Sequence, residues 1–228
     1  MQNSIQTWDR WQSAIILLVW VLAFQLDAWP LLFWTVALSF VVFIGMHWRE
    51  WGHFKPYGGY PNYVTAFRLG LVFLLAILFP HLTDWQIALW AAVVIALDGV
   101  DGMVARYFVQ ESYIGAYFDM ESDVVYVLAM SSILYLTGKV EAWIFVPALM
   151  RYFYVLVIWI CGKAEVSAKG GNWARWVAGS YFGVILLPFV WDADMAKICL
   201  AVVAIVLVLS FMRSFYFVLQ PANKKSDN

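Results

Sequence analysis

The stretch LDGVDGMVARYFVQESYIGAYFDMESD, from Leu97 to Asp123, carries six of the 15 acidic residues of a 228-residue chain. The same chain is 64% hydrophobic and only 13% charged. Carboxylates are costly in apolar surroundings and usually have a function there. The stretch therefore predicts a functional site, and the apolar sequence around it indicates the kind of protein that holds the site.

The composition indicates an integral membrane protein. A soluble domain has about 25% charged residues, whereas this chain has 13% and a mean hydropathy of +0.76. Apolar runs of roughly 16 to 24 residues recur along nearly the whole chain, and such runs are long enough to cross a bilayer as helices. We expect an all-α bundle of membrane-spanning helices with no separate soluble domain.

Breaks between the apolar runs divide the chain into eight predicted membrane-spanning helices. Only Ala28, Trp29 and Pro30 separate the first two. A tight helical hairpin and one long kinked helix therefore both fit this part of the sequence. The predicted spans cover residues 11–28, 31–47, 64–80, 85–108, 114–136, 142–161, 174–191 and 196–217.

The positions of Lys and Arg predict the orientation, because basic residues beside a span are mostly retained on the cytoplasmic side. One side of the predicted bundle has only Lys139 and Lys197. We expect the other side, with both termini and the acidic stretch, to be cytoplasmic, in a membrane such as the bacterial inner membrane. Its basic residues are Arg10, Arg49, Lys55, Arg106, Lys163, Lys169, Arg175, Arg213, Lys224 and Lys225.

Two sets of residues in the acidic stretch recur with the spacing of one helix face. Both lie near the cytoplasmic ends of consecutive predicted helices, and a short connection makes these helices antiparallel neighbours. The aspartates are therefore expected to converge at one depth. The sets are Asp98, Asp101, Gly102 and Ala105 on the first helix, and Gly115, Asp119 and Asp123 on the second.

Four clustered carboxylates need compensation for their charge. One charged carboxylate at the bilayer centre costs about 2.5 to 3.5 kcal/mol on insertion scales, and four together repel one another. Protonation would relieve this cost, as in a proton relay. Mg²⁺ or Mn²⁺ would also relieve it, because hard cations prefer oxygen ligands. Four carboxylates suit two such ions about 4 Å apart, an arrangement that clamps a phosphoryl group during displacement.

The small residues Gly102, Ala105 and Gly115 fit the same chemistry, since they let a phosphate or a ring approach the backbone. Small residues also pack membrane helices together, and this alternative stays open. Arg106 suits a diphosphate, although an arginine at this depth is also typical of a membrane-edge anchor.

The pattern from Asp98 to Asp123 resembles the signature of the CDP-alcohol phosphotransferase family: D, two residues, DG, two residues, AR, eight residues, G, three residues, D, three residues, D. Every fixed position is matched. Enzymes of this kind have six spans, and the first often opens with Pro-Asn followed by Thr and Arg. The corresponding residues here are Pro61, Asn62, Thr65 and Arg68.

The resemblance implies a division of the chain and a reaction. Residues 61–217 would be the family core, residues 1–60 an extension with two spans, and residues 218–228 a short cytoplasmic tail. An alcohol would attack the phosphorus attached to the lipid, CMP would leave, and Asp123 would take the proton of the alcohol. The resemblance implies metal ligands at Asp98, Asp101, Asp119 and Asp123, and a CDP site at Gly102, Ala105, Arg106, Gly115, Asn62, Thr65 and Arg68.

A second group of basic residues concerns the acceptor. Arg151 lies in the sixth predicted span and should face the bundle interior, where it pairs either with Glu121 or the aspartates, or with a substrate phosphate. Lys163, Lys169 and Arg175 lie on a cytoplasmic connection, where they would assist a phosphorylated acceptor or serve only as loop charge. Glu121 points away from the metal face.

We therefore expect a phospholipid-synthesising transferase that uses CDP-diacylglycerol, a polar alcohol and Mg²⁺ or Mn²⁺. Glycerol 3-phosphate is the first candidate for the alcohol, followed by inositol phosphate and serine. A relative that joins CDP-choline or CDP-ethanolamine to diacylglycerol is the alternative within the family. An inactive membrane scaffold and a cation or proton transporter are alternatives of other classes. We expect membrane lipid as a partner, a homodimer as in family members, and no nucleic acid.

Overall fold

The computed structural model describes residues 2–162 and 172–219, and these residues form helices and no strand. The all-α prediction is confirmed. The long helices are α1 (Gln2–Leu26), α2 (Trp29–Met46), α4 (Tyr60–Leu78), α5 (Asp84–Phe108), α6 (Tyr113–Leu136), α7 (Phe145–Ile160), α8 (Asn172–Val184) and α10 (Ala193–Leu219). The short ones are α3 (Trp48–Trp51), α9 (Leu187–Val190) and the 3-10 helices η1 (Phe79–His81) and η2 (Ala142–Ile144).

The first two predicted spans form a helical hairpin and not one kinked helix. Asp27 adopts a left-handed conformation with φ of 52°, and its carboxylate accepts a hydrogen bond of 2.9 Å from the Trp29 indole. Pro30 occupies the first turn of α2, where its missing N–H is not needed. The turn reverses the chain, so α1 and α2 pack against each other.

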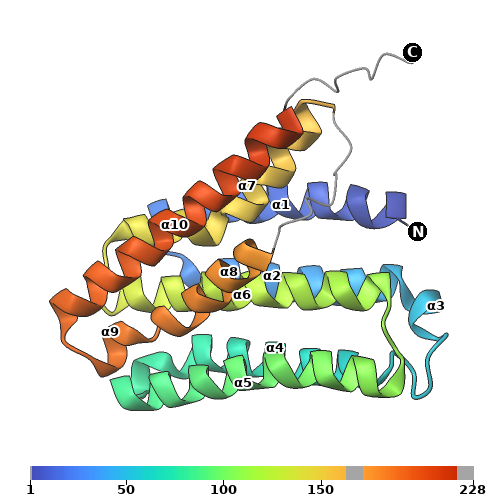
Figure 1. Ribbon diagram of the computed structural model, residues 1–228, viewed down its shortest axis with the longest axis horizontal. Coiled ribbons are helices and arrows are strands. Elements are labelled where there is room, and N and C mark those ends of the chain that lie inside the picture. The colour runs from blue at the N-terminus through green and yellow to red at the C-terminus, as the bar shows by residue number, and fades with distance from the viewer. Residues whose placement is uncertain (1, 163–171, 220–228) are drawn as a thin grey trace.

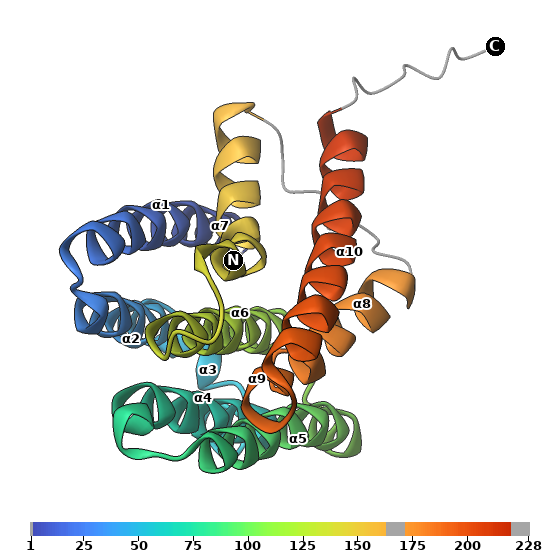
Figure 2. The ribbon, with the colours of Figure 1, turned by 90° about the vertical axis from the view of Figure 1, so that its left-hand side faces the viewer.

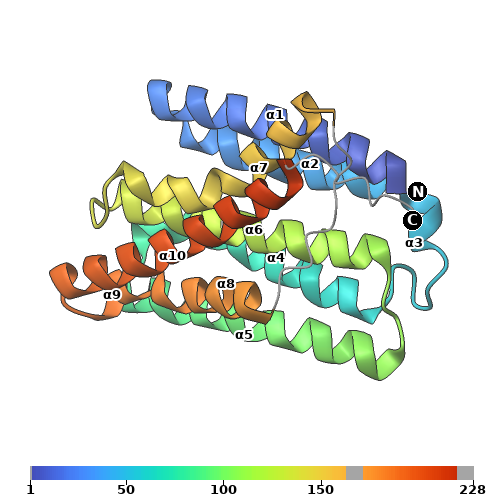
Figure 3. The ribbon, with the colours of Figure 1, turned by 45° about the horizontal axis from the view of Figure 1, so that its top comes forward.

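Helix α6 is the centre of the bundle. It lies between the hairpin α1–α2 and the pair α4–α5, and α7 and α10 cross the bundle obliquely (Figures 1, 2 and 3). All ten residues from 125 to 134 on α6 are buried. Because α6 also carries Asp119 and Asp123, this buried helix presents two of the four aspartates in the aspartate cluster (Asp98, Asp101, Asp119 and Asp123).

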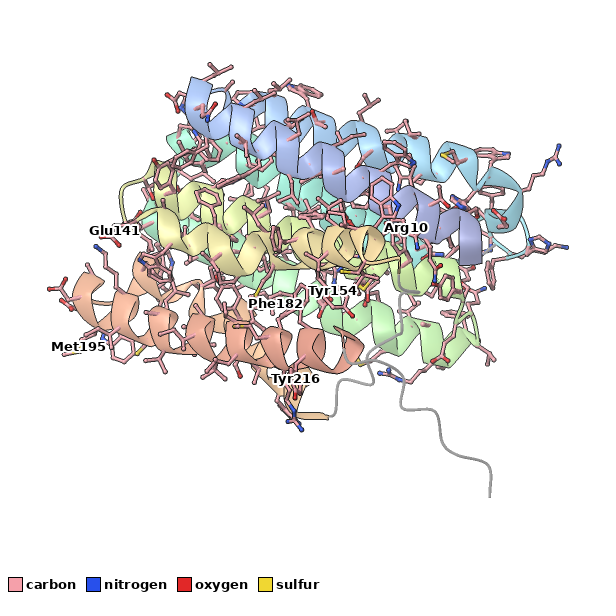
Figure 4. All side chains as sticks on the ribbon, turned by 90° about the horizontal axis from the view of Figure 1, so that it is seen from above. Arg10, Glu141, Tyr154, Phe182, Met195 and Tyr216 are labelled. Carbon is pink, nitrogen blue, oxygen red and sulfur yellow. The ribbon has the colours of Figure 1, made fainter. Side chains whose placement is uncertain are left out.

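The connections alternate between two ends of the bundle. Glu141 and Met195 lie at one end, away from Arg10 (Figure 4). This end contains the exposed ion pairs of Lys139 with Asp84 and of Lys197 with Glu141. The connection between α5 and α6, and with it the aspartate cluster, belongs to the other end. Among the residues that the structure describes, the aspartates therefore share an end with most of the basic residues, as the sequence predicts.

Within residues 2–162 and 172–219, five helical segments are long and apolar enough to cross a membrane, and the predicted spans in α1, in α6 and in α8–α9 are not among them. Helix α6 is not among them, because Asp119, Glu121 and Asp123 place three acids in its apolar stretch. The seventh predicted span is interrupted: α8 ends at Val184 and Pro188 lies in the first turn of α9. A shorter apolar segment, Trp176–Val190, runs across this break. The five segments are Trp29–Met46, Tyr60–His81, Asp84–Phe108, Ala142–Ile160 and Ala193–Arg213.

Candidate active site

The connection between α5 and α6 brings the four aspartates together. Helix α5 ends at Phe108, and the next residue, Val109, has a φ of 53° that turns the chain sharply. Ser112 then caps α6 by accepting a hydrogen bond of 3.0 Å from the Gly115 N–H. The two helices run antiparallel, so the C-terminal end of α5 faces the N-terminal end of α6. The aspartate cluster, defined as Asp98, Asp101, Asp119 and Asp123, lies at this junction with α4.

Arg68 of α4 reaches the centre of the aspartate cluster. Its side chain is 2% exposed and forms ion pairs with all four carboxylates. Its Nη2 lies 2.8 Å from Asp119 Oδ1 and 3.0 Å from Asp123 Oδ1, while Nη1 contacts Asp98 and Asp101. One guanidinium offsets only one of four carboxylate charges. The cluster thus retains an excess of three negative charges when all four aspartates are ionised.

The carboxylates have the donor chemistry of a divalent cation site. One oxygen each of Asp98, Asp119 and Asp123 lies within 4.8 Å of the others. Oxygens around one Mg²⁺ at about 2.1 Å lie up to about 4.2 Å apart, so a bound ion would draw these oxygens together and take the place of the Arg68 guanidinium that pairs with them here. These three side chains are between 31% and 40% exposed, which leaves them accessible to an ion. The residues therefore fit Mg²⁺ or Mn²⁺.

Asp101 occupies a different position within the cluster. Its side chain is 6% exposed and accepts a hydrogen bond of 3.1 Å from the Thr65 hydroxyl. The same hydroxyl lies 3.2 Å from the Pro61 carbonyl, so Thr65 ties the first turn of α4 to the cluster. Thr65, predicted for the CDP site, is thus buried against a predicted metal ligand.

The two signature glycines differ in what surrounds them. A Cβ on Gly115 would lie 2.9 Å from Ser112 Oγ and 3.0 Å from Asn62 Oδ1, so the protein itself fills this space. Asn62 is held there by donating to the Gly58 carbonyl at 2.6 Å. A Cβ on Gly102 would meet only the Arg106 guanidinium, at 3.6 Å. Gly102 therefore leaves open space, which a ligand can approach, whereas Gly115 is required by helix contact.

An open cavity adjoins this space. It has a volume of about 390 Å³ and is lined by Ala105, Arg106, Val109 and Glu111. Ala105 and Arg106 belong to the residues predicted for CDP. The cavity lies at the end of α5, one to two turns beyond Asp101.

Arg151 forms a second buried cluster with Glu121 of α6 and Asp9 of α1. Its Nη2 lies 3.3 Å from Asp9 Oδ1, and its Nη1 pairs with Glu121. This is the ion-pair alternative that the sequence left open, and Glu121 does face away from the metal ligands. Asp9, Gln12 and Tyr117 complete this cluster and were missed, Asp9 because the first span was predicted to begin only at residue 11. We call Asp9, Gln12, Tyr117, Glu121 and Arg151 the rear cluster.

The remaining predicted acceptor residues cannot be placed. Lys163 and Lys169 lie outside the described residues, and so does the side chain of Arg175. Their part in acceptor binding stays a prediction, as do the metal and CDP roles.

Comparison with known proteins identifies the family. The family model for CDP-alcohol phosphatidyltransferase matches residues 59–220, well over half of the chain. Neither the search of curated proteins nor the search of solved structures found a match. The match covers α4 to α10 and hence the whole aspartate cluster, but not α1 and α2. The chain belongs to the CDP-alcohol phosphatidyltransferase family.

Proposed function

We propose that this protein transfers the phosphatidyl group of CDP-diacylglycerol to a polar alcohol and releases CMP. Family membership supports transfer between a CDP-alcohol and an alcohol. The observation that carries the proposal is the partly exposed aspartate cluster at one end of an apolar bundle. At this position a lipid donor reaches the site from the bilayer, while CMP and a water-soluble alcohol exchange with the aqueous side.

The aspartates have distinct parts in the proposed reaction. Asp98, Asp101, Asp119 and Asp123 would hold Mg²⁺ or Mn²⁺, which supplies positive charge to the diphosphate. Asp123 is the proposed general base, the role that the resemblance of the sequence pattern implies for it, and its side chain is 31% exposed and so accessible to an alcohol. It accepts the proton of the acceptor hydroxyl while the hydroxyl oxygen forms a bond to the lipid phosphorus. The bond from this phosphorus to the CMP oxygen breaks, and CMP leaves with the electron pair.

Residues of α5 form the proposed donor end of the site. Arg106 borders the open cavity, and Gly102 leaves room beside it. A guanidinium is suited to the diphosphate of the donor. We propose that Ala105, Arg106 and Gly102 bind the CDP moiety, and that Asn62, Thr65 and Gly115 shape the site through their mutual contacts.

Glycerol 3-phosphate remains the first acceptor to test, with inositol phosphate and serine next. Arg151 gives no support for a phosphorylated acceptor, because Glu121 and Asp9 already pair with it. A phosphate would depend on Arg106, Arg175, Lys163 and Lys169. We propose a cytoplasmic site, consistent with the basic residues at this end, in a homodimer within a membrane such as the bacterial inner membrane.

The test is CMP release by purified protein in nanodiscs with CDP-diacylglycerol, Mg²⁺ or Mn²⁺ and a panel of alcohols. We expect CMP and a new phospholipid with one acceptor class, and neither product after chelation with EDTA. Asp84→Asn is a matched control, since Asp84 is an exposed aspartate at the opposite end of α5.

The outcomes separate the alternatives. Turnover only with CDP-choline or CDP-ethanolamine and diacylglycerol would replace the proposal by the alternative donor. Folded protein without turnover on any donor, combined with ion flux into vesicles, would support a transporter instead.

A further inference from the structure

Helix α6 carries functional side chains on two opposite faces. Asp119 and Asp123 face the aspartate cluster, and Glu121 between them faces the rear cluster. Two residues along a helix correspond to a rotation of about 200°. The rear cluster therefore holds the same helical turn that presents the two predicted metal ligands.

The rear cluster is closed and directional. Arg151, Asp9 and Glu121 are 8%, 2% and 1% exposed. Gln12 donates to Glu121 Oε2 at 3.1 Å and to Ser39 Oγ at 3.3 Å. These contacts join α1, α2, α6 and α7. Hydrogen bonds depend on the angle between donor and acceptor, whereas apolar contacts do not, so these contacts restrict how the helices can rotate against one another.

Tyr117 extends these contacts by one helical turn. Its hydroxyl lies 3.1 Å from both Asp9 Oδ1 and Gln12 Oε1, either of which can accept its single proton. The Arg151 guanidinium lies 5.8 Å from the centre of the Tyr117 ring, on its face. Tyr117 and Glu121 are thus both held by α1, four residues apart on α6.

The N-terminal hairpin also packs apolar groups against this part of α6. Phe40 and Phe43 of α2 contact the rings of Phe118 and Tyr117, with centroids 5.6 and 5.0 Å apart. The hairpin lies wholly outside the residues that the family model matches. It nevertheless supplies Asp9 and Gln12, the polar partners of three residues within the match, Tyr117, Glu121 and Arg151.

We propose that Asp9 and Gln12 are positioning residues that fix the rotation and axial height of α6, and thereby the placement of Asp119 and Asp123 for metal. This inference rests on the proposed function, since it assumes that the aspartate cluster binds a divalent cation. A shift of α6 by one residue would rotate both aspartates by about 100°. The extension is, on this account, part of the catalytic unit and more than an added anchor.

A buried ion pair by itself is weak evidence for stability, because apolar replacements often stabilise a protein equally well. What such a network does provide is a unique register. Its effect should therefore appear at the metal site, and the test needs a measurement of metal binding that does not depend on turnover.

The test uses the full chain in nanodiscs and the loss of the free Mn²⁺ signal in electron paramagnetic resonance. Asp9→Asn keeps the shape and leaves Arg151 paired with Glu121, and Gln12→Leu removes only hydrogen bonds. We expect each to raise the Kd for Mn²⁺ by about tenfold, since groups that orient metal ligands usually contribute 10- to 100-fold. Asp9→Glu should restore most of the affinity, and Asp84→Asn should leave it unchanged.

The results distinguish failure of this inference from failure of the proposed function. Wild-type protein that binds no Mn²⁺ would contradict the proposed metal site, and the positioning role would fail with it. Wild-type binding with the same Kd in both variants would overturn the positioning role alone. If neither variant yields folded protein by size-exclusion chromatography, the rear cluster serves folding only, and the inference is also overturned.

Discussion

The aspartate cluster and the rear cluster each place one arginine among carboxylates, and they differ in exposure and charge. Asp98, Asp119 and Asp123 are between 31% and 40% exposed around Arg68. Asp9 and Glu121 are at most 3% exposed around Arg151. Four carboxylates surround the first arginine, and two surround the second.

The difference shows what each cluster is able to do. A closed cluster with its polar groups satisfied holds helices in register and gains nothing from a ligand. An open cluster with an excess of three negative charges is unfavourable by itself and becomes favourable when cations bind. Function and stability should therefore respond in opposite ways to substitutions in the two clusters.

The largest effect is expected for Asp123→Asn in the aspartate cluster. The amide keeps the shape but cannot accept the proton of the alcohol, so CMP release should fall at least about 1,000-fold. The melting temperature without metal should stay the same or rise, because one of four repelling charges is removed. CMP assays and thermal unfolding of the same preparation measure both effects. A variant that retains a tenth of the activity would exclude Asp123 as the general base.

Arg151→Met should have the converse effect in the rear cluster. Removal of one partner leaves Asp9 and Glu121 buried without a cation, which costs about 3 to 5 kcal/mol. For a chain of this size the melting temperature should fall by about 10 °C. Arg151→Lys should lose less, because the charge remains although the planar fork is lost. An unchanged melting temperature for Arg151→Met would show that the rear cluster is not closed in the membrane.

Metal should distinguish the two clusters in the wild type. Mn²⁺ at a concentration of 100 times its Kd should stabilise the protein by about 2.7 kcal/mol, and EDTA should reverse this. The gain should disappear in Asp119→Asn, which removes one proposed ligand. Thermal unfolding with and without Mn²⁺ measures the effect. Equal stabilisation of the wild type and the variant would place the ion elsewhere.

The aspartate cluster was predictable because helical spacing alone brings the aspartates of α5 and of α6 each to one face. The breaks between apolar runs likewise predicted the helices of the bundle. The rear cluster was only half predictable. The position of Arg151 in an apolar span indicates a buried anion. Its partner Asp9, however, lies in the first turns of α1, where polar residues hide the apolar pattern that marks a helix. The position of Arg68 among the aspartates was not predictable either, because it depends on how α4 packs against α5 and α6 and not on the sequence near Arg68.

The exposed ion pair of Glu141 with Lys197, at the opposite end of the bundle, should contribute less to stability than the buried rear cluster. The pKa of Glu141 lies below its ordinary value, because the Glu141 backbone N–H and then the Lys197 and Trp143 side chains hydrogen-bond the carboxylate. A lowered pKa in the folded state means stability that is present above the ordinary pKa of glutamate, about 4.3, and lost as the pH falls through the lowered value.

Glu141→Gln should therefore lower the melting temperature slightly at pH 7, by about 2 °C or less, because exposed ion pairs contribute little. The difference from the wild type should vanish as the pH falls below about 4, and CMP release at pH 7 should not change. Thermal unfolding of both proteins across this pH range provides the measurement. A loss as large as that of Arg151→Met would show that burial does not determine how much an ion pair contributes to the stability of this protein.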